Sequence, residues 1–369
     1  MRKGILFAAS RRRIFHLLLL MLAASTVVSA QKGRIVSEVL KSDLLVDTAT
    51  GEDPNRSVAV YLPPSYDSSP QRRYPVLYLL HGIADTEKTW LRSWNDENTG
   101  YEGLPAVMDR GIERGKFGEF IVVMPDQRTK WFGSFYVNST ATGNWADFTA
   151  KDLVSFIDNK YRTIPDSENR AIAGHSMGGY GAITLGMKYP DVFTTVYGMN
   201  PAIIDWGGDL TIEQPGFRTV IEAKSPEELL QSRSVFVLGA ITVCQAFSPN
   251  PSKPPYFCDH PFKIVDGRLV PSEPGFSKWA ENSPIRMVPK YRENLSKLNA
   301  LKFDSGYEDE FRFIPVNSRL LSLALTNNGI DHVFEEYNGD HRNRLWGRHG
   351  RIVNEVLPFV WDHIAPDAP

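Results

Sequence analysis

The chain has 369 residues, of which 42% are hydrophobic, 11% aromatic and 23% charged. This length and composition exclude a disordered or low-complexity chain and suit one large α/β domain or two small ones. A formal net charge of −2 excludes overall basicity as a route to nucleic acid or to anionic membranes. Two cysteines are too few for a disulfide-scaffolded fold or a cysteine-rich metal site. We therefore expect a globular protein of enzyme size that has no nucleic-acid partner.

Residues 1–30 have the features of an export signal. A basic stretch comes first, a short apolar run follows, and small residues then resemble a cleavage site. These three parts are Arg2, Lys3 and Arg11-Arg12-Arg13; residues 17–24; and Val28-Ser29-Ala30. The apolar run is shorter than the roughly 20 residues that span a bilayer, so we expect cleavage rather than a stable membrane anchor. An uncleaved anchor is the alternative, and the arginines leave the twin-arginine route open beside general secretion.

Cleavage after Ala30 predicts a secreted or periplasmic protein whose residues 31–369 form a single domain. The first 30 residues contain five basic and no acidic side chains, so their loss changes the formal net charge from −2 to −7. The exported domain is therefore expected to be acidic.

The rest of the chain alternates short apolar runs with helical patterns, which predicts an α/β fold with a mostly parallel central sheet flanked by helices. In chain order, the pattern predicts strands over 58–62 and 74–80, a helix over 104–114, a strand over 120–124, a helix over 148–161, a strand over 170–173, a helix over 178–189, strands over 194–199 and 301–303, a helix over 317–327 and a strand over 332–337. The nearly continuous apolar character of 74–80 is typical of a buried parallel strand.

Residues 201–300 interrupt this alternation. They are rich in proline and glycine, and seven prolines fall between positions 249 and 274. A loop of this length inside one domain is usually functional, for example as a lid. We expect a cap inserted into the single domain rather than a linker between two domains.

The sequence Gly174-His175-Ser176-Met177-Gly178 matches the pattern G-x-S-x-G. It lies between the predicted strand 170–173 and the predicted helix 178–189, as a nucleophile elbow requires. In an elbow, a strained turn exposes the serine hydroxyl above the sheet, and the glycines relieve crowding where helix and strand meet. A glycine-rich turn without chemistry is the alternative. We expect Ser176 to be a nucleophile.

A serine hydroxyl needs a base, and in this arrangement an acid and then a histidine follow it along the chain. His341 follows the predicted strand 332–337 and a turn, so it lies where a base can reach the elbow. We expect His341 to be the base and keep His349 as the second choice. For the acid, the strand 301–303 runs into a turn marked by Gly306. Asp309 is the first choice in that turn.

Glu308 and Asp304 are the second and third choices for the acid, and an ordinary solvated turn is the alternative for this acidic stretch. The oxyanion hole needs two backbone N–H groups aimed at the developing negative charge. One follows the nucleophile, at Met177. The second is expected after the strand 74–80, where His81-Gly82 lets the backbone approach the substrate and places the amide of Ile83.

From about residue 58 to 364 the chain resembles the esterase D family of α/β-hydrolases. The matching motifs are Leu79-Leu80-His81-Gly82 with Trp90, SFYVNS at 134–139, AIAGHSMGGYGA at 171–182, Gly306-x-x-Asp309 and Tyr337-x-Gly339-x-His341. This family includes feruloyl and acetylxylan esterases, S-formylglutathione hydrolase, enterochelin esterases and mycolyltransferases. The resemblance implies an α/β-hydrolase fold, a triad of Ser176, Asp309 and His341, and oxyanion donors at Ile83 and Met177. The proline-rich insertion at about 245–275 departs from the family pattern.

These features predict a secreted serine carboxylic-ester hydrolase that works through an acyl-enzyme, needs no metal or organic cofactor and resembles feruloyl or acetylxylan esterases. Its partner is expected to be a small-molecule or polysaccharide-linked ester. Acyl transfer to another alcohol, as in the mycolyltransferases, is the first alternative. An exported binding protein on an inactive hydrolase scaffold is the second, and peptidase activity is the third.

Cys244 and Cys258 both lie in the predicted cap, 14 positions apart. In an oxidising compartment they can close a short loop with a disulfide. Two separate buried thiols are the alternative.

Overall fold

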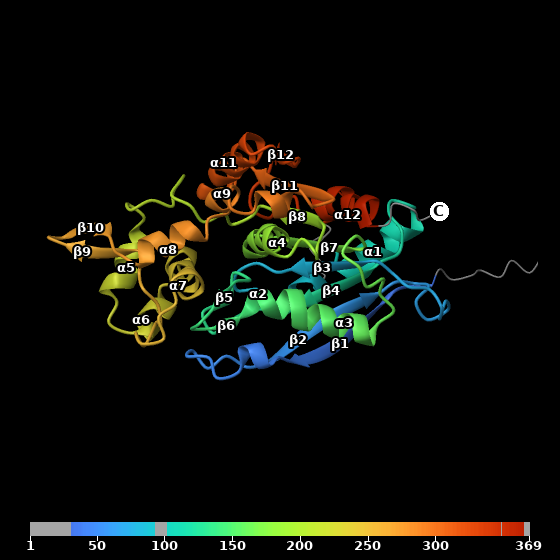
Figure 1. Cartoon of the computed structure of the whole chain (residues 1–369), viewed down its shortest axis with the longest axis horizontal. Helices are drawn as coiled ribbons and strands as arrows, with labels where there is room; N and C mark the ends of the chain where they lie inside the picture. Colours follow the sequence, from blue (N-terminus) through green and yellow to red (C-terminus); the bar gives the residue numbers. More distant parts are fainter. Residues whose placement is uncertain (1–30, 93–101, 348, 365–369) are drawn as a thin grey trace, which may run out of the picture. The chain divides into compact units, whose positions relative to one another are not determined.

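Eight strands form the central sheet in the order β1-β2-β4-β3-β7-β8-β11-β12 (Figure 1). This computed structural model describes residues 31–92, 102–347 and 349–364, so the predicted export signal lies outside the described residues. The strands are β1 (Arg34–Lys41), β2 (Asn55–Leu62), β3 (Val76–Leu80), β4 (Ile121–Pro125), β7 (Arg170–His175), β8 (Thr195–Met199), β11 (Ala300–Gly306) and β12 (Val333–Tyr337). Residues 32–369 make up one structural unit.

Six neighbouring strands of this sheet are parallel. β4, β3, β7, β8, β11 and β12 pair in parallel, whereas β2 pairs antiparallel with both β1 and β4. The prediction of a mostly parallel sheet is therefore confirmed. Because parallel neighbours end at the same edge, the loops after β3, β7, β8, β11 and β12 all leave the sheet on one side.

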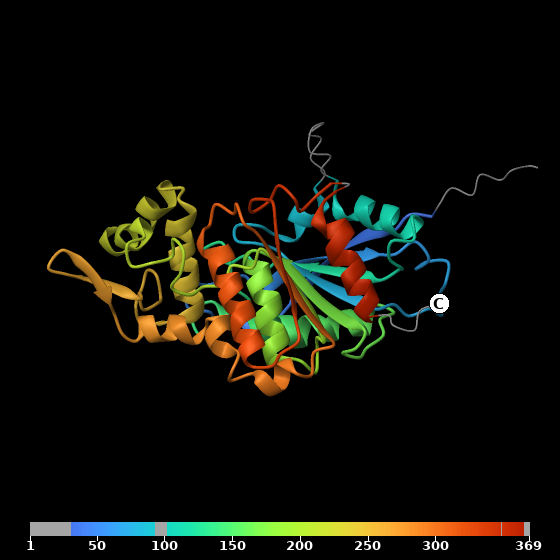
Figure 2. The ribbon, with the colours of Figure 1, turned by 90° about the horizontal axis from the view of Figure 1, so that it is seen from above.

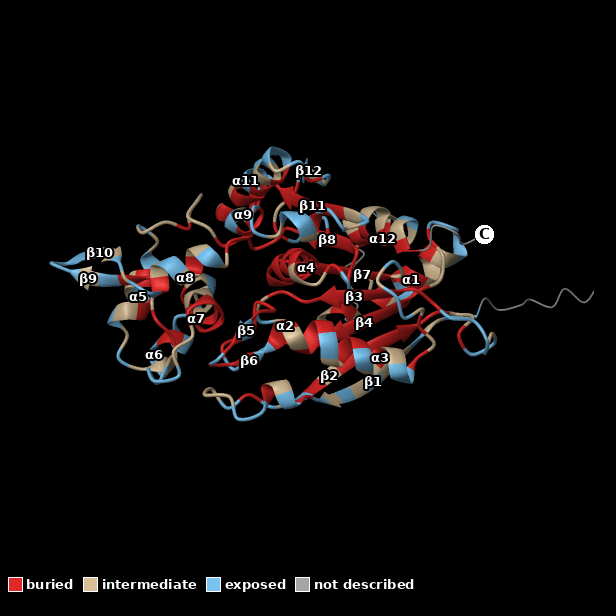
Figure 3. Ribbon diagram, viewed as in Figure 1, coloured by how far each residue is buried: buried red, intermediate tan, exposed pale blue. Residues whose placement is uncertain are grey.

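Helices cover both faces of the sheet, as Figure 2 shows from above. On one face lie α3 (Val154–Lys160), α4 (Met177–Lys188) and α11 (Phe313–Asn327); on the other lie α1 (Leu104–Glu113) and α12 (Leu357–Ile364). Successive strand residues point to opposite faces. In β3, the buried side chain of Tyr78 packs in the hydrophobic core on the face covered by α3, α4 and α11. The buried side chain of Leu79 packs in the core on the opposite face, under α1 and α12. This two-sided cover explains the continuous apolar runs that Figure 3 shows as buried strands.

The predicted strands and helices of the alternating region are present, with shifted ends. The helix predicted over 148–161 begins earlier, as α2 (Trp145–Asp147), continues through a π-helical turn (Phe148–Leu153) and ends with α3. β11 extends to Gly306, so Asp304 lies inside a strand rather than in the turn after it. The edge strand β1 and the last helix α12 were not among the predicted elements.

The segment between β8 and β11 has its own secondary structure. It contains α5 (Pro215–Glu222), α6 (Pro226–Gln231), α7 (Val235–Phe247), the hairpin β9 (Phe262–Val265) and β10 (Arg268–Pro271), α8 (Gly275–Glu281), α9 (Pro284–Met287) and α10 (Arg292–Leu295). In Figure 1, α5 to α8 and the hairpin gather beside β5 (Asn138–Ser139) and β6 (Gly143–Asn144). The proline-rich stretch that suggested a loop is thus only one part of a largely helical cap.

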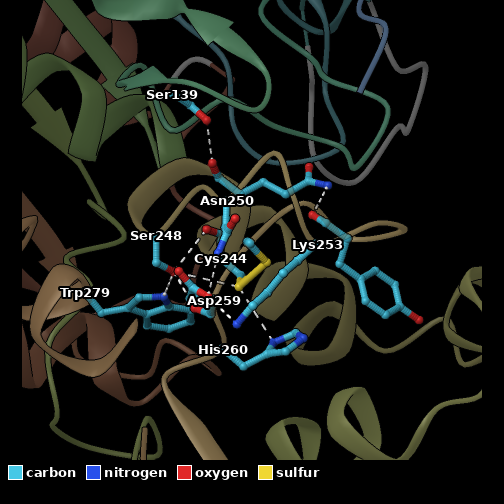
Figure 4. The surroundings of a disulfide bond; sticks show 11 residues. Ser139, Cys244, Ser248, Asn250, Lys253, Asp259, His260 and Trp279 are labelled. Atoms are coloured by element: carbon cyan, nitrogen blue, oxygen red, sulfur yellow. Dashed lines mark hydrogen bonds and ion pairs between the residues drawn. A yellow bond between two sulfur atoms is a disulfide. The ribbon is translucent and has the colours of Figure 1, made fainter. Parts of the chain in front are cut away.

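Aromatic rings and a disulfide hold this cap together. The Trp206 ring stacks on Phe276 and Trp279, with ring centroids 5.1 and 5.8 Å apart. Cys244, near the end of α7, is joined to Cys258 in the proline-rich stretch by a disulfide (Figure 4). Close by, Ser139 Oγ donates a hydrogen bond of 2.6 Å to the carbonyl of Gln245. The end of α7 is therefore connected both to the proline-rich stretch of the cap, through the disulfide, and to the hairpin β5–β6, through Ser139.

Among the described residues, no helix is long and apolar enough to cross a membrane.

The disulfide is expected to contribute to stability chiefly by restricting the unfolded chain. For a loop of 14 residues the chain-entropy model gives about 3 kcal/mol. We expect the double variant Cys244→Ala/Cys258→Ala to lose about this much free energy of unfolding in a urea titration. Dithiothreitol is expected to destabilise the native protein by a similar amount and to leave the variant unchanged. Alkylation of both cysteines in the native protein without reductant would contradict the bridge.

Candidate active site

Ser176 lies at a sharp turn between the end of β7 and the start of α4. Its backbone angles are φ 57° and ψ −117°, in a region that non-glycine residues rarely adopt. Its amide donates to the carbonyl of Met199 at 2.9 Å, which holds the turn against the end of β8. The Ser176 side chain makes no capping hydrogen bond to α4, so its hydroxyl is not engaged by the helix.

The two glycines of the motif are required by close packing of the backbone. A Cβ atom on Gly174 would lie 2.3 Å from the carbonyl oxygen of Gly178. A Cβ atom on Gly178 would lie 2.2 Å from the carbonyl oxygen of Leu80, at the end of β3. Both distances are below any allowed contact, so α4 can approach β3 and β7 this closely only with glycine at these positions. The motif therefore has the structural context of a nucleophile elbow.

His341 lies in the loop after β12 and is hydrogen-bonded to Asp309. Its Nδ1 donates to Oδ2 of Asp309 at 2.7 Å, and both side chains are buried. The other carboxylate oxygen of Asp309 accepts from the amide of Phe311 at 2.8 Å. Because Nδ1 carries the proton in this bond, Nε2 of His341 has a free lone pair. This is the tautomer that a general base requires.

The turn that holds Asp309 packs directly against the loop that holds His341. A Cβ atom on Gly306 would lie 2.3 Å from the carbonyl oxygen of Gly339. The amide of Glu308 also donates to that carbonyl at 3.0 Å. The acidic turn and the base loop thus form one packed unit at the carboxyl edge of the sheet.

The alternative acids and base lie elsewhere. Asp304 is buried inside β11, where it accepts from Nε of Arg351 at 2.6 Å and from the hydroxyl of Tyr197 at 2.7 Å. Glu308 and His349 are both exposed. The structure therefore brings Asp309 and His341 together. It does not bring the alternative acids, Glu308 and Asp304, or the alternative base, His349, into this pair.

Ser176 and His341 line one cavity with a volume of about 170 Å³. Ile83, the expected oxyanion donor after β3, and Met177 line the same cavity. Neither the amide of Ile83 nor that of Met177 donates to another residue in the part of the chain that the structure describes. Two unengaged amides beside the serine are what an oxyanion hole needs.

The loop that carries Ile83 is held from both sides. The buried His81 ring interacts through Nδ1 with the carbonyl of Gly82 at 2.8 Å, and its Nε2 accepts from the amide of Gln127 at 2.8 Å. Burial lowers the pKa of His81, so the ring stays neutral and can accept this bond. The hydroxyl of Tyr136, from the SFYVNS motif, donates to the carbonyl of His81 at 2.8 Å. Through Tyr136, the SFYVNS motif therefore helps to hold the loop that carries Ile83.

Two residues that the sequence analysis did not assign support the base loop. The carbonyl of His341 accepts from Nε2 of His175 at 2.9 Å and from Nδ2 of Asn200 at 3.1 Å. Oδ1 of Asn200 also accepts from the amide of Gly306 at 2.7 Å, at the start of the acidic turn. Asn200 therefore connects the base loop to the acid turn. Its position directly after β8, beside the elbow strand, is the signal that could have indicated it.

Burial determines the protonation of these groups. It lowers the pKa of His341 to about 4 and that of His175 to about 3. Burial raises the pKa of Asp309 to about 7, while the Phe311 amide opposes this rise by stabilising the carboxylate. A neutral His341 can accept a proton from Ser176, and an ionised Asp309 stabilises the imidazolium that forms.

The chain belongs to an esterase family. The family model described as "Putative esterase" matches residues 50–349, which include the elbow, the acidic turn and the base loop. This match confirms the resemblance indicated by the motifs.

Curated relatives match over part of their length. Over 137 residues, 36% of its length, the chain is 35% identical to an endo-1,4-beta-xylanase/feruloyl esterase of Xylanibacter ruminicola. Over 136 residues, 37% of its length, it is 35% identical to Esterase Rv1288 of Mycobacterium tuberculosis. These matches span only 18% and 26% of those two proteins.

Solved structures are similar over nearly the whole chain. A ferulic acid esterase matches with a TM-score of 0.58 and 24% identity, over 90% of this chain and 98% of that one. An S-formylglutathione hydrolase from Agrobacterium tumefaciens matches with a TM-score of 0.54 and 16% identity, over 91% of this chain and 97% of that one. These matches confirm the predicted α/β-hydrolase fold.

Replacing Asn200 is expected to misplace the base loop. For Asn200→Ala we expect kcat with a p-nitrophenyl ester to fall about 100-fold with little change in KM, because the catalytic groups lose alignment. Loss of its buried hydrogen bonds should also cost about 1–3 kcal/mol of unfolding free energy.

Asn317→Ala is the matched control. Asn317 is equally buried and donates to the carbonyls of Ile203 and Asp205 at 2.9 and 3.0 Å, and these bonds involve neither the base loop nor the acidic turn. It should lose similar stability and keep its kcat. Equal losses of kcat in both variants would contradict a positioning role for Asn200.

Acid is expected to inactivate the site. Protonated His341 cannot accept a proton, and protonated Asp309 no longer stabilises the imidazolium, so kcat/KM should fall as the pH is lowered from about 7 to about 4. Initial rates with a p-nitrophenyl ester, followed at the isosbestic wavelength, measure this profile. Constant kcat/KM across this range would be incompatible with the assigned base and acid.

Proposed function

We propose that the protein is a serine carboxylic-ester hydrolase in which Ser176, His341 and Asp309 form the catalytic triad. The proposal rests on one observation. Ser176 and His341 line the same cavity, and Nδ1 of His341 forms a hydrogen bond of 2.7 Å with the buried Asp309. Family membership and the names of the matched relatives support the same reaction.

The reaction follows from the positions of these groups. Ser176 Oγ attacks the ester carbonyl while Nε2 of His341 takes its proton. The amides of Ile83 and Met177 stabilise the negative charge on the carbonyl oxygen in the tetrahedral intermediate. His341 then returns the proton to the leaving alcohol. Water, activated by the same histidine, hydrolyses the acyl-enzyme and releases the acid.

We further propose that the enzyme is exported and acts on esters of the kind that feruloyl and acetylxylan esterases hydrolyse. The export signal predicted for residues 1–30 and the feruloyl esterases among the matched proteins support this proposal. A panel of methyl ferulate, acetylated xylan and short p-nitrophenyl esters tests the substrate class. The same panel with an added acceptor alcohol separates hydrolysis from acyl transfer.

Ser176→Ala is expected to lower kcat for p-nitrophenyl acetate by about 10⁶-fold, because the nucleophile is lost while the fold is retained. A fluorophosphonate probe should label the native protein and leave Ser176→Ala unlabelled. Ser277→Ala, on the exposed part of α8, is the matched control and should keep both activity and labelling. Turnover that persists in Ser176→Ala would overturn the assignment. A native protein that the probe does not label would favour a binding protein on an inactive scaffold.

A further inference from the structure

The cavity above Ser176 is walled on its far side by one face of the cap helix α7. Phe236, Gly239, Ala240 and Val243 of this helix line the cavity. Their spacing of three and four residues places them on the same face of a helix. The cap therefore shapes the space that faces the proposed nucleophile.

Gly239 leaves open space at the centre of this wall. Glycine is unfavourable inside a helix, and Gly239 lies in the middle of the 13-residue α7. A Cβ atom built on it would have only one neighbour within contact distance, Cδ1 of Ile83 at 4.0 Å. The elbow glycines, by contrast, are enclosed by backbone atoms. The absence of a side chain at position 239 therefore enlarges the cavity rather than permitting close packing.

The face of α7 that lines the cavity offers no polar side chain to a substrate. The polar side chains that other parts of the cap contribute to the lining are Gln214 and Trp279. The amide of Gln214 accepts from the Gly216 N–H at 3.3 Å and donates to the carbonyl of Asp209 at 3.2 Å. The indole N–H of Trp279 donates to Oγ of Ser248 at 3.1 Å. A hydroxyl buried against α7 would lose its hydrogen bonds to water without compensation.

The charged residues that line the cavity lie near the reacting groups instead. Asp85 follows the oxyanion loop two residues after Ile83, and Arg342 follows His341 directly. Polar character is thus concentrated where the ester group reacts, and the cap side is apolar.

The position of His341 marks the alcohol side of the ester. His341 protonates the leaving alcohol, so the alcohol must lie on the side of His341. On that side, Phe311 packs edge-on against the His341 ring at 5.0 Å and against Phe236 at 5.8 Å. A Cβ atom on Gly239 would have Cδ1 of Ile83 as its only neighbour within 4 Å, and no atom of Phe311 or His341. The space at Gly239 is therefore separate from the alcohol side and is open to the acyl chain.

From this arrangement we infer that the cavity takes an apolar acyl group without hydroxyls, and that Gly239 sets the size of the acyl group that fits. The inference rests on the proposed ester hydrolysis and narrows the substrate class proposed above: acetyl and other acyl groups without hydroxyls are favoured, and hydroxylated groups such as feruloyl are disfavoured. The volume of about 170 Å³ slightly exceeds an apolar cavity of about 150 Å³ that holds benzene. The cavity thus suits a single unsubstituted ring or a chain of about six carbons.

Two substrate series test the acyl preference of the native enzyme. From p-nitrophenyl acetate to the hexanoate, kcat/KM should rise about fourfold per methylene buried. Methyl cinnamate should be hydrolysed about tenfold faster, in kcat/KM, than methyl 4-hydroxycinnamate, which differs only by the hydroxyl. Equal rates along the acyl series, or a preference for the hydroxylated ester, would overturn the inference.

Gly239→Leu tests the position itself, with Gly239→Ala as the size control. The leucine should lower the ratio of kcat/KM for the hexanoate to kcat/KM for the acetate at least tenfold, because only the longer chain reaches position 239. The alanine methyl fits at 4.0 Å from Ile83 and should keep the native profile. In a series of acetate esters with alcohols of increasing length, Gly239→Leu should show the same dependence of kcat/KM on alcohol length as the native enzyme. Equal losses for acetate and hexanoate, or losses confined to the alcohol series, would contradict the inference.

A binding measurement separates this inference from the proposed function. Trp279 lines the cavity, so its fluorescence should report occupancy in the inactive Ser176→Ala variant. Methyl cinnamate should bind to Ser176→Ala about tenfold more tightly than to Ser176→Ala/Gly239→Leu, whether or not the native protein turns over esters. If ester turnover fails while this difference in binding is observed, only the proposed reaction is wrong. If turnover is observed and the two variants bind methyl cinnamate equally, only the acyl assignment is wrong.

Discussion

The close approach of α4 to the ends of β3 and β7 is the constraint on which the site depends. Gly174 and Gly178 permit it, since a Cβ atom at either position would fall within 2.4 Å of a backbone carbonyl. This packing forces Ser176 into a left-handed conformation and places its hydroxyl above the sheet. It also leaves the amide of Met177 free at the start of the helix. The proposed nucleophile and one proposed oxyanion donor thus result from the same backbone geometry.

The proposed base and acid, His341 and Asp309, are held to this turn by buried hydrogen bonds rather than by their own strands. His175, the residue before the nucleophile, supports the carbonyl of His341, and Asn200 joins that loop to the turn of Asp309. Burial keeps both histidines neutral by lowering their pKa values. A network of this kind is stable only when every member is satisfied, which makes its alignment sensitive to single substitutions.

The cap contributes the other half of the cavity and has a different chemistry. Its core is aromatic, its helix α7 is almost entirely apolar, and the disulfide from Cys244 to Cys258 holds the end of that helix. The catalytic edge of the sheet is, by contrast, rich in charged and hydrogen-bonding groups. The division places the polar candidate site beside an apolar wall of the cavity, an arrangement common in ligand sites.

The sequence by itself determined the fold class, and it predicted the turn at Ser176 and the chain order of the proposed catalytic groups, because these depend on local patterns: buried strands, the spacing around Ser176, and turns after strands. It did not indicate Asn200, whose role arises from contacts with residues more than 100 positions away. Nor did it indicate α7, because the prolines nearby suggested a loop, or Gly239, because an empty space has no sequence pattern. Only the tertiary structure decided which acid contacts His341 and which residues wall the cavity, since both depend on long-range packing between the sheet and the cap.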